Sequence, residues 1–280
     1  MKLSYPVGRD IYFDNIKGKL ILLVVLGHCL EFYPSCNLCL FVYVVLYSFV
    51  MPCFAFVSGL FFKQKFKTII RYLLIYLFAQ LLFLMCAVHS FAEISVIQFL
   101  TPRWTLWYLL CLFYWYTLSN LLILCKCSMR AMVWFAVILC IISGFLKIGY
   151  FLSLQRASAY FFFFALGMYI QRPACYKFIN TINKRYLIRC CLVGVFILAC
   201  IYQASFFPKA FYNSYPYFSF WPWSSSSILA VRILQFILSV IFSLFLFQHT
   251  SSQKNFYTWC GYYSLWIYIL HALLLMQLHS

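Results

Sequence analysis

Acidic residues are almost absent from this sequence, whose 280 residues include only four Asp and Glu. Charged residues of both signs make up 9% of the chain, and no polar stretch is long enough to build a separate domain in water. Ordinary globular proteins carry about a quarter charged residues and about half apolar ones. Hydrophobic residues here reach 66%, which a soluble fold of this length has no interior to hide. The composition therefore excludes a water-soluble enzyme and requires a lipid bilayer as solvent.

Internal repeats are not evident either, which weakens the interpretation as a transporter built from inverted repeats. Apolar runs alternate instead with short polar segments, and a helix needs roughly 20 mostly apolar residues to cross a bilayer. The sequence thus predicts an all-α polytopic bundle of about nine to ten spanning helices, in one membrane-embedded domain over residues 1–280. The nine runs cover residues 16–34, 38–62, 69–89, 104–124, 131–149, 158–171, 186–206, 228–248 and 260–278.

Cations, in contrast, are plentiful: 21 Lys and Arg give a net charge of +17. No nucleic acid is expected as a partner, because most of these charges lie in short loops between apolar runs. Cytoplasmic loops of membrane proteins collect Lys and Arg. With a cytoplasmic N-terminus, 16 of the 21 cations fall inside, so we predict a multi-pass protein in this orientation. The cations left outside are Arg103, Lys147, Arg156, Lys209 and Arg232.

The 14 cysteines are scattered, mostly inside apolar runs, where Cys behaves as a small hydrophobe. Only Cys36 and Cys39 have the spacing of a metal-binding or redox pair. They lack a second pair and a nearby His, so no metal site is expected. A disulfide between Cys36 and Cys39 is possible if this loop is exported.

Three ionisable residues of the first apolar run are of interest, namely Lys17, His28 and Glu31. Such groups are costly inside a bilayer and are therefore candidates for function. Lys17 and His28 return to one helical face and sit roughly 16 Å apart along the axis. Glu31 follows His28 at i+3 and can share this face. Gly27, beside His28, would let another group approach the helix closely.

This spacing suits a long, narrow cofactor. His is a good general base near neutral pH, and a carboxylate such as Glu31 can hold its tautomer and stabilise the imidazolium. Lys17, at the cytoplasmic mouth, could hold the phosphorylated head of coenzyme A, whose extended arm ends in a thioester. In plainer interpretations, His28 bonds another helix and Lys17 snorkels to the interface. The residues alone leave these alternatives open.

Other polar residues have side chains of a kind that could belong to the same site. Arg71 opens the third run and Lys67 precedes it, either to bind cofactor phosphates or to anchor the chain at anionic lipid. Ser58 ends the second run, a position more typical of helix packing or capping than of a nucleophile. His271, in the last run, is a weaker buried-histidine candidate. The aromatic, Pro-rich stretch 206–227 is either an interfacial loop or a platform for a sugar.

Five segments of the chain, in order, carry a family resemblance. They are Arg9-x4-Asp14-x2-Lys17-Gly18 leading into Val25-Leu26-Gly27-His28, then Val50 to Gly59, Leu106 to Leu110, Phe161 to Tyr169, and Gly261-x2-Ser264-x3-Tyr268-x2-His271. Together they resemble the motifs of the acyltransferase-3 family of membrane O-acyltransferases, and most closely its fucose 4-O-acetylase-like branch. Two positions depart from the family pattern, since no proline follows Arg71, and Tyr160 stands where the family has Pro before its Phe run.

The resemblance implies transfer of an acyl group, usually acetyl, from cytosolic acetyl-CoA to a hydroxyl of a surface polysaccharide or lipid-linked sugar. It places the protein in a bacterial inner membrane. It implies that His28 is catalytic, and we expect Glu31 to assist it. We expect Asp14, Lys17, Lys67 and Arg71 to bind acetyl-CoA, and Ser58, Trp107 and His271 to bind the acceptor.

Two other functions stay open. A membrane transporter or flippase of a lipid-linked glycan would use His28 and Glu31 as a proton relay, and would move substrate without consuming acetyl-CoA. A non-catalytic membrane partner would keep only the fold. Loss of acetyl-CoA binding on substitution of Lys17 would argue against this last interpretation.

Overall fold

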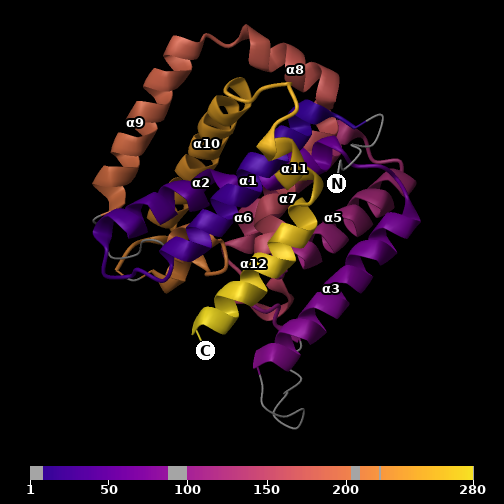
Figure 1. The fold of residues 1–280 in the computed structure, drawn as a ribbon, viewed down its shortest axis with the longest axis horizontal. Helices are drawn as coiled ribbons and strands as arrows, with labels where there is room; N and C mark the ends of the chain where they lie inside the picture. Colours follow the sequence, from indigo (N-terminus) through magenta and orange to yellow (C-terminus); the bar gives the residue numbers. More distant parts are fainter. Residues whose placement is uncertain (1–8, 88–99, 203–208, 221, 280) are drawn as a thin grey trace.

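The computed structural model describes residues 9–87, 100–202, 209–220 and 222–279, and within these ranges the chain forms helices and no strand (Figure 1). The predicted all-α bundle is confirmed for this part of the chain. Of the aromatic, Pro-rich stretch 206–227, residues 206–208 and 221 lie outside the described residues. The elements are α1 (Ile11–Leu30), α2 (Asn37–Leu60), α3 (Phe66–Ala87), α5 (Trp107–Leu124), α6 (Met129–Ser143), η2 (Phe151–Ser153), α7 (Leu154–Ile170), α8 (Arg172–Thr181), α9 (Lys184–Tyr202), η3 (Lys209–Tyr212), η4 (Tyr217–Ser219), α10 (Ser225–Gln248), α11 (Phe256–Tyr262) and α12 (Ser264–His279).

Every predicted apolar run coincides with a helix, but the count of nine to ten spans is not supported. Among the described residues, five helices are long and apolar enough to cross a membrane, namely α2, α3, α5, α9 and α10. The bent pair α11 and α12 makes a sixth if it counts as one span. α1 falls short because Asp14, Lys17 and Lys19 lie within its 20 residues.

Two further helices, α6 and α7, were predicted as spans but are too short to cross a membrane. α6 has 15 residues and α7 has 17, fewer than the roughly 20 that a span needs. α7 is also buried along most of its length, including Tyr160, Phe161 and Phe164. Apolar composition therefore overcounts the spans, because a run buried within the bundle is as apolar as one that faces lipid.

Glycines mark the closest approaches between helices of the bundle. A Cβ at Gly18 of α1 would overlap the backbone carbonyl of Tyr257, and a Cβ at Gly261 of α11 would overlap that of Asp14. A second pair, Gly59 and Gly167, brings α2 and α7 together in the same way. Small residues at helix crossings are typical of membrane bundles, where close packing replaces the hydrophobic effect.

The last hydrophobic run is broken into α11 and α12, which meet at an angle of 82°. Asn255 starts α11 by accepting a hydrogen bond from the N–H of Tyr257. α11 packs across α1, and α12 then continues past the same helix (Figure 1). The break therefore brings Tyr268 and His271, from the end of the sequence, next to the helix that begins it.

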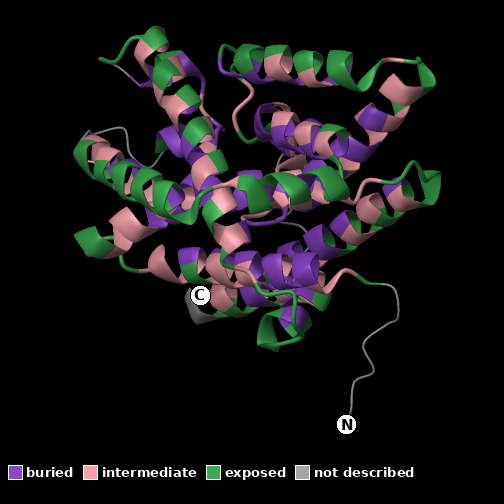
Figure 2. Cartoon of the chain, turned by 90° about the horizontal axis from the view of Figure 1, so that it is seen from above, coloured by how far each residue is buried: buried purple, intermediate pink, exposed green. Residues whose placement is uncertain are grey.

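Buried residues gather inside the bundle, and exposed ones lie along the outer helices (Figure 2). Two cations counted as lying outside prove to be buried within helices: Arg156 is 7% exposed in α7, and Arg232 is 4% exposed in α10. Aromatic faces compensate both charges, since the guanidinium of Arg156 lies over Trp107 and that of Arg232 over Tyr217. These partners come from other segments of the chain, so counting charges along the sequence could not show that either arginine is buried.

Candidate functional site

His28 lies in the last turn of α1, and Glu31 caps that helix. The Nδ1 of His28 is 3.1 Å from Oε2 of Glu31. An ionised carboxylate only accepts hydrogen bonds, so Nδ1 carries the ring hydrogen and Nε2 keeps its lone pair. A general base needs this arrangement, in which an acid fixes the tautomer and stabilises the imidazolium.

Two aromatic side chains from other parts of the chain hold Glu31. The hydroxyl of Tyr43 in α2 donates to Oε1 at 2.6 Å, and the indole N–H of Trp104 donates to Oε2 at 3.2 Å. Three donors on one carboxylate favour its ionised form. The Trp104 ring also packs edge-on against His28, with 4.9 Å between centroids. Trp104 has a φ of 35°, a costly conformation for a bulky residue that is typical of functional sites.

His271 of α12 lies beside His28, with 5.5 Å between ring centroids. Its Nδ1 is 2.9 Å from the carbonyl oxygen of Ile267. A carbonyl only accepts, so Nδ1 donates and Nε2 keeps its lone pair. Among the described residues this buried Nε2 has no hydrogen-bond partner, and such an atom calls for a reason. The structure therefore brings together His28, Glu31 and His271, three of the residues expected from the sequence.

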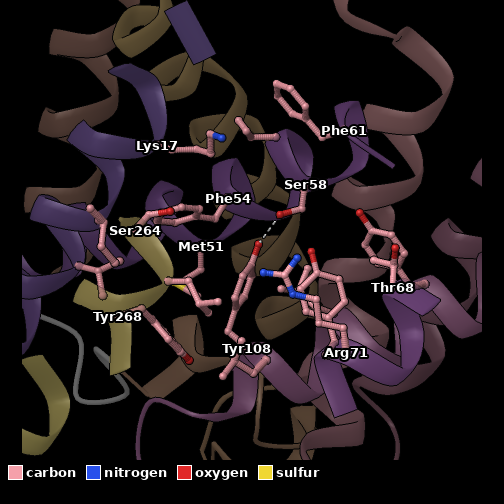
Figure 3. A pocket seen from close by; sticks show the side chains of 18 residues that line it. Lys17, Met51, Phe54, Ser58, Phe61, Thr68, Arg71, Tyr108, Ser264 and Tyr268 are labelled. Atoms are coloured by element: carbon pink, nitrogen blue, oxygen red, sulfur yellow. Dashed lines mark hydrogen bonds between the residues drawn. The ribbon is translucent and has the colours of Figure 1, made fainter. Parts of the chain in front are cut away.

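A cavity of about 280 Å³ opens on the Lys17 side of the bundle (Figure 3). Lys17 of α1 and Arg71 of α3 line it from different sides, and in its wall Ser58 of α2 shares a hydrogen bond of 3.0 Å with Tyr108 of α5. Most of the remaining lining is apolar. Ligand pockets commonly measure roughly 300–1,000 Å³, so this cavity suits a narrow arm rather than a whole nucleotide.

An ion network holds Lys17 at this cavity. Asp14 Oδ1 lies 2.6 Å from Lys17 Nζ, and Asp14 Oδ2 lies 2.8 Å from Arg9 Nε. Asp14 is 1% exposed and does not line the cavity. A buried carboxylate would repel phosphate, so this geometry gives Asp14 the task of orienting Lys17. Lys67, the other residue expected at the cofactor, is exposed on α3 and does not line the cavity either.

Val24 and Met51 lie between the cavity and a second, smaller space beside His28. A smaller space of about 30 Å³, lined by His28, Gly27 and Tyr43, shares Val24 and Met51 with the larger cavity. The close approach expected at Gly27 is not made by any described residue, because a Cβ there would meet nothing within 4 Å. His28 thus lines a small space that Val24 and the flexible Met51 separate from the larger cavity.

Trp107, expected at the acceptor, lines neither space. It is buried, stacks on Tyr160 with 5.6 Å between centroids, and has the guanidinium of Arg156 at 4.9 Å from its ring. The next residue, Tyr108, lines the cavity instead. Successive side chains of a helix point about 100° apart. Trp107 and Tyr108 therefore lie in the same turn of α5 but point in different directions, and only Tyr108 points into the cavity.

Tyr43, Trp104 and Tyr108 were not expected from the sequence. Tyr43 and Trp104 are two of many aromatic residues in a chain with 23 Tyr and 8 Trp, and in the segment Leu106 to Leu110 only Trp107, the neighbour of Tyr108, was expected at the site. The available signal was physical: a Tyr or Trp in a buried run needs a partner for its polar atom. Glu31, one of four acidic residues in the chain, was the available acceptor near the end of its helix.

Comparison with known proteins gives one match. Residues 10–279 match the family model described as Acyltransferase domain, which defines the acyltransferase-3 family. No curated protein and no solved structure matches the chain. The matched region extends from the cap of α1 to the end of α12, and so includes every residue of the site described above except Arg9. With nearly its whole length matched and several helices apolar enough to span a bilayer, this multi-pass membrane protein belongs to the acyltransferase-3 family.

Proposed function

We propose that this protein is an O-acyltransferase of the bacterial inner membrane. It transfers an acetyl group from acetyl-CoA to a hydroxyl of a surface polysaccharide or lipid-linked sugar. The N-terminus lies on the cytoplasmic side, as the distribution of Lys and Arg favours, so the cavity at Lys17 and Arg71 opens toward cytosolic acetyl-CoA. Membership of the family supports acyl transfer at a membrane, and the donor, the acceptor and the role of His28 are inferred from the site.

The observation that carries the proposal is the position of the His28–Glu31 pair. It lies where a cavity with cations at its mouth approaches a second open space, with only Val24 and Met51 between them. An acyl transfer between two substrates needs a proton acceptor at such a junction. A proton relay in a transporter would need no cavity for a phosphorylated arm on one side of its histidine.

The larger cavity fits the pantetheine arm of acetyl-CoA. Lys17 and Arg71 would bind its phosphates through charge-assisted hydrogen bonds. The apolar lining would pack along the arm, and Ser58 and Tyr108 offer hydrogen bonds to its amides. Because the cavity holds only about 280 Å³, the nucleotide stays at the mouth, and the thioester arrives at Met51.

In the transfer step, Nε2 of His28 takes the proton of the acceptor hydroxyl as its oxygen attacks the thioester carbonyl carbon. The carbon–sulfur bond then breaks, and the imidazolium gives the proton to the departing thiolate of coenzyme A. The products are the acetyl ester and free coenzyme A, and His28 returns to its neutral form. Glu31 stabilises the imidazolium between the two proton transfers.

A second route through the same atoms uses His28 as an acyl carrier. Nε2 would attack the thioester first, release coenzyme A and then pass the acetyl group to the acceptor. This route predicts a burst of coenzyme A release, with acetyl retained on the protein, when no acceptor is present. The general-base route predicts that release requires the acceptor.

Mass spectrometry of surface glycans tests the proposed function. Cells with the gene should carry sugars heavier by the mass of an acetyl group, and cells without it should lose these species. Restoring the gene should return them, and a gene encoding His28→Ala should not. An unchanged spectrum after deletion contradicts the proposal, and glycans that disappear from the surface altogether point to transport.

A further inference from the structure

Arg156, in the first turn of α7, is a buried cation close to the proposed catalytic pair. Only 7% of the residue is exposed. Its Nε donates to the backbone carbonyl of Tyr212 at 3.1 Å, and its guanidinium lies 4.9 Å from the ring centroid of Trp107 and 5.0 Å from that of Tyr150. These contacts fix the plane of the guanidinium but use only one of its three nitrogens as a donor.

No carboxylate pairs with Arg156 among the described residues. The chain has four acidic residues, of which Asp10, Asp14 and Glu31 form ion pairs with other cations. The fourth, Glu93, lies outside the described residues. No described residue accepts a hydrogen bond from Nη1 or Nη2 of Arg156. A buried guanidinium without an anion is costly, and cation–π contacts offset that cost only in part.

Two tyrosines connect Arg156 to the space beside His28. Tyr212, whose carbonyl holds the guanidinium, packs its ring on Tyr47 with 4.9 Å between centroids. Tyr47 lines the same small space as His28. The Tyr212 hydroxyl also bonds that of Tyr43 at 3.2 Å, the group that donates to Glu31. Arg156 lines neither space itself, but through Tyr212 it is linked both to the wall of the space at His28 and to the hydroxyl that holds Glu31.

Arg232 of α10 is a second buried arginine and serves as the comparison. It is equally buried, at 4% exposure, and its guanidinium lies 4.6 Å from the ring centroid of Tyr217. Its Nη1 donates to Ser143 Oγ at 3.4 Å, and its buried Nε has no hydrogen-bond partner among the described residues. Neither arginine lines the space at His28, but only Arg156 has a partner, Tyr212, whose ring packs on a residue that does. Arg156 also differs in having both terminal nitrogens without a partner among the described residues.

We propose that Arg156 binds an anionic group of the acceptor: the carboxylate of an acidic sugar or the phosphate of a sugar phosphate. This inference rests on the proposed function, and it narrows the acceptor from any hydroxyl-bearing glycan to one that carries a negative charge. The two terminal nitrogens offer the parallel donors that carboxylate and phosphate accept bidentately. The anion of the acceptor would also supply the negative charge that no described residue offers to Arg156.

Binding of three soluble probes to the purified full-length protein tests the proposal. The probes are methyl β-glucuronide, glucose 1-phosphate and the neutral methyl β-glucoside, with affinity followed by intrinsic fluorescence. The wild-type protein should bind at least one anionic probe roughly tenfold to hundredfold more tightly than the neutral one, as expected for hydrogen bonds to a charged group. Preference for the glucuronide identifies an acidic sugar, and preference for the phosphate identifies a sugar phosphate.

The Arg156→Gln variant should lose this preference, Arg156→Lys should keep part of it, and the matched control Arg232→Gln should retain it. Equal binding of neutral and anionic probes by the wild type, or an unchanged preference in Arg156→Gln, overturns the inference. The wild-type comparison decides the matter even if Arg156→Gln does not fold.

Coenzyme A binding and acetyl transfer are measured on the same preparations. Their absence, with the anion preference intact, contradicts the proposed function and leaves the Arg156 site standing.

Discussion

His28 of α1 and His271 of α12 lie with their ring centroids 5.5 Å apart, and each has its Nδ1 held by a different kind of acceptor. A carboxylate holds His28, whereas a backbone carbonyl holds His271. Only His28 therefore has a negative charge in contact that stabilises its protonated form. We therefore propose that His28 transfers the proton and that His271 accepts a hydrogen bond from a substrate hydroxyl.

Replacement of His271 by Phe should reduce acetyl transfer by roughly threefold to tenfold, because one neutral hydrogen bond is lost. Most of the loss should appear as a higher KM for the acceptor. Steady-state kinetics on membrane vesicles, with acceptor and acetyl-CoA varied separately, checks this. A loss as large as that of the His28 variants would mean that both imidazoles take part in proton transfer.

Replacement of Glu31 by Gln should reduce kcat by roughly 10²-fold to 10⁴-fold, the range associated with a general base. The amide removes the charge that stabilises the imidazolium and can donate to Nδ1, which favours the wrong tautomer. Acetyl-CoA binding, measured by equilibrium dialysis, should not change. Tyr43→Phe, which removes one of the hydrogen bonds to Glu31, is the control and should cost only about tenfold. Wild-type kcat in Glu31→Gln would remove Glu31 from the mechanism.

Two glycines of α1 should respond in opposite ways to the same substitution. Gly27→Leu places a side chain in open space beside His28, so the protein should fold, with helix propensity improved by about 1 kcal/mol, but lose most acetyl transfer. Gly18→Leu would drive a side chain into the Tyr257 carbonyl and should prevent stable insertion. Size-exclusion profiles and transfer assays distinguish the two. An active Gly27→Leu protein would mean that no substrate enters this space.

Three basic residues should differ in their effect on the donor. Arg71→Ala and Lys17→Met should each raise the KM for acetyl-CoA by roughly tenfold to hundredfold, the value of a hydrogen bond between charged groups. Lys67→Ala is the matched control and should have little effect, because Lys67 is exposed and does not line the cavity. The effects should weaken as salt is added, since the mouth is open to water. Equal effects of all three substitutions would indicate general attraction of anions.

The sequence predicted the contact between His28 and Glu31, because their i+3 spacing depends only on helix geometry, although α1 begins and ends earlier than the predicted run and is not among the candidate spans. It did not predict what surrounds Glu31, since Tyr43 and Trp104 come from separate segments that meet only in the folded bundle. Arg156 was counted as lying outside for a similar reason: its partners Trp107 and Tyr212 lie far away in the chain. The span count failed because apolar composition does not distinguish the buried α7 from a helix facing lipid.

Acetyl transfer by His28→Ala tests the central claim most directly. Membrane vesicles containing equal amounts of folded wild type, His28→Ala and the control His249→Ala would receive radiolabelled acetyl-CoA and native glycan acceptor. His249 is exposed at the end of α10, so its variant should match the wild type. His28→Ala should retain coenzyme A binding and lose roughly 10²-fold to 10⁴-fold in transfer rate. Transfer at the wild-type rate by a correctly folded His28→Ala protein would contradict the account.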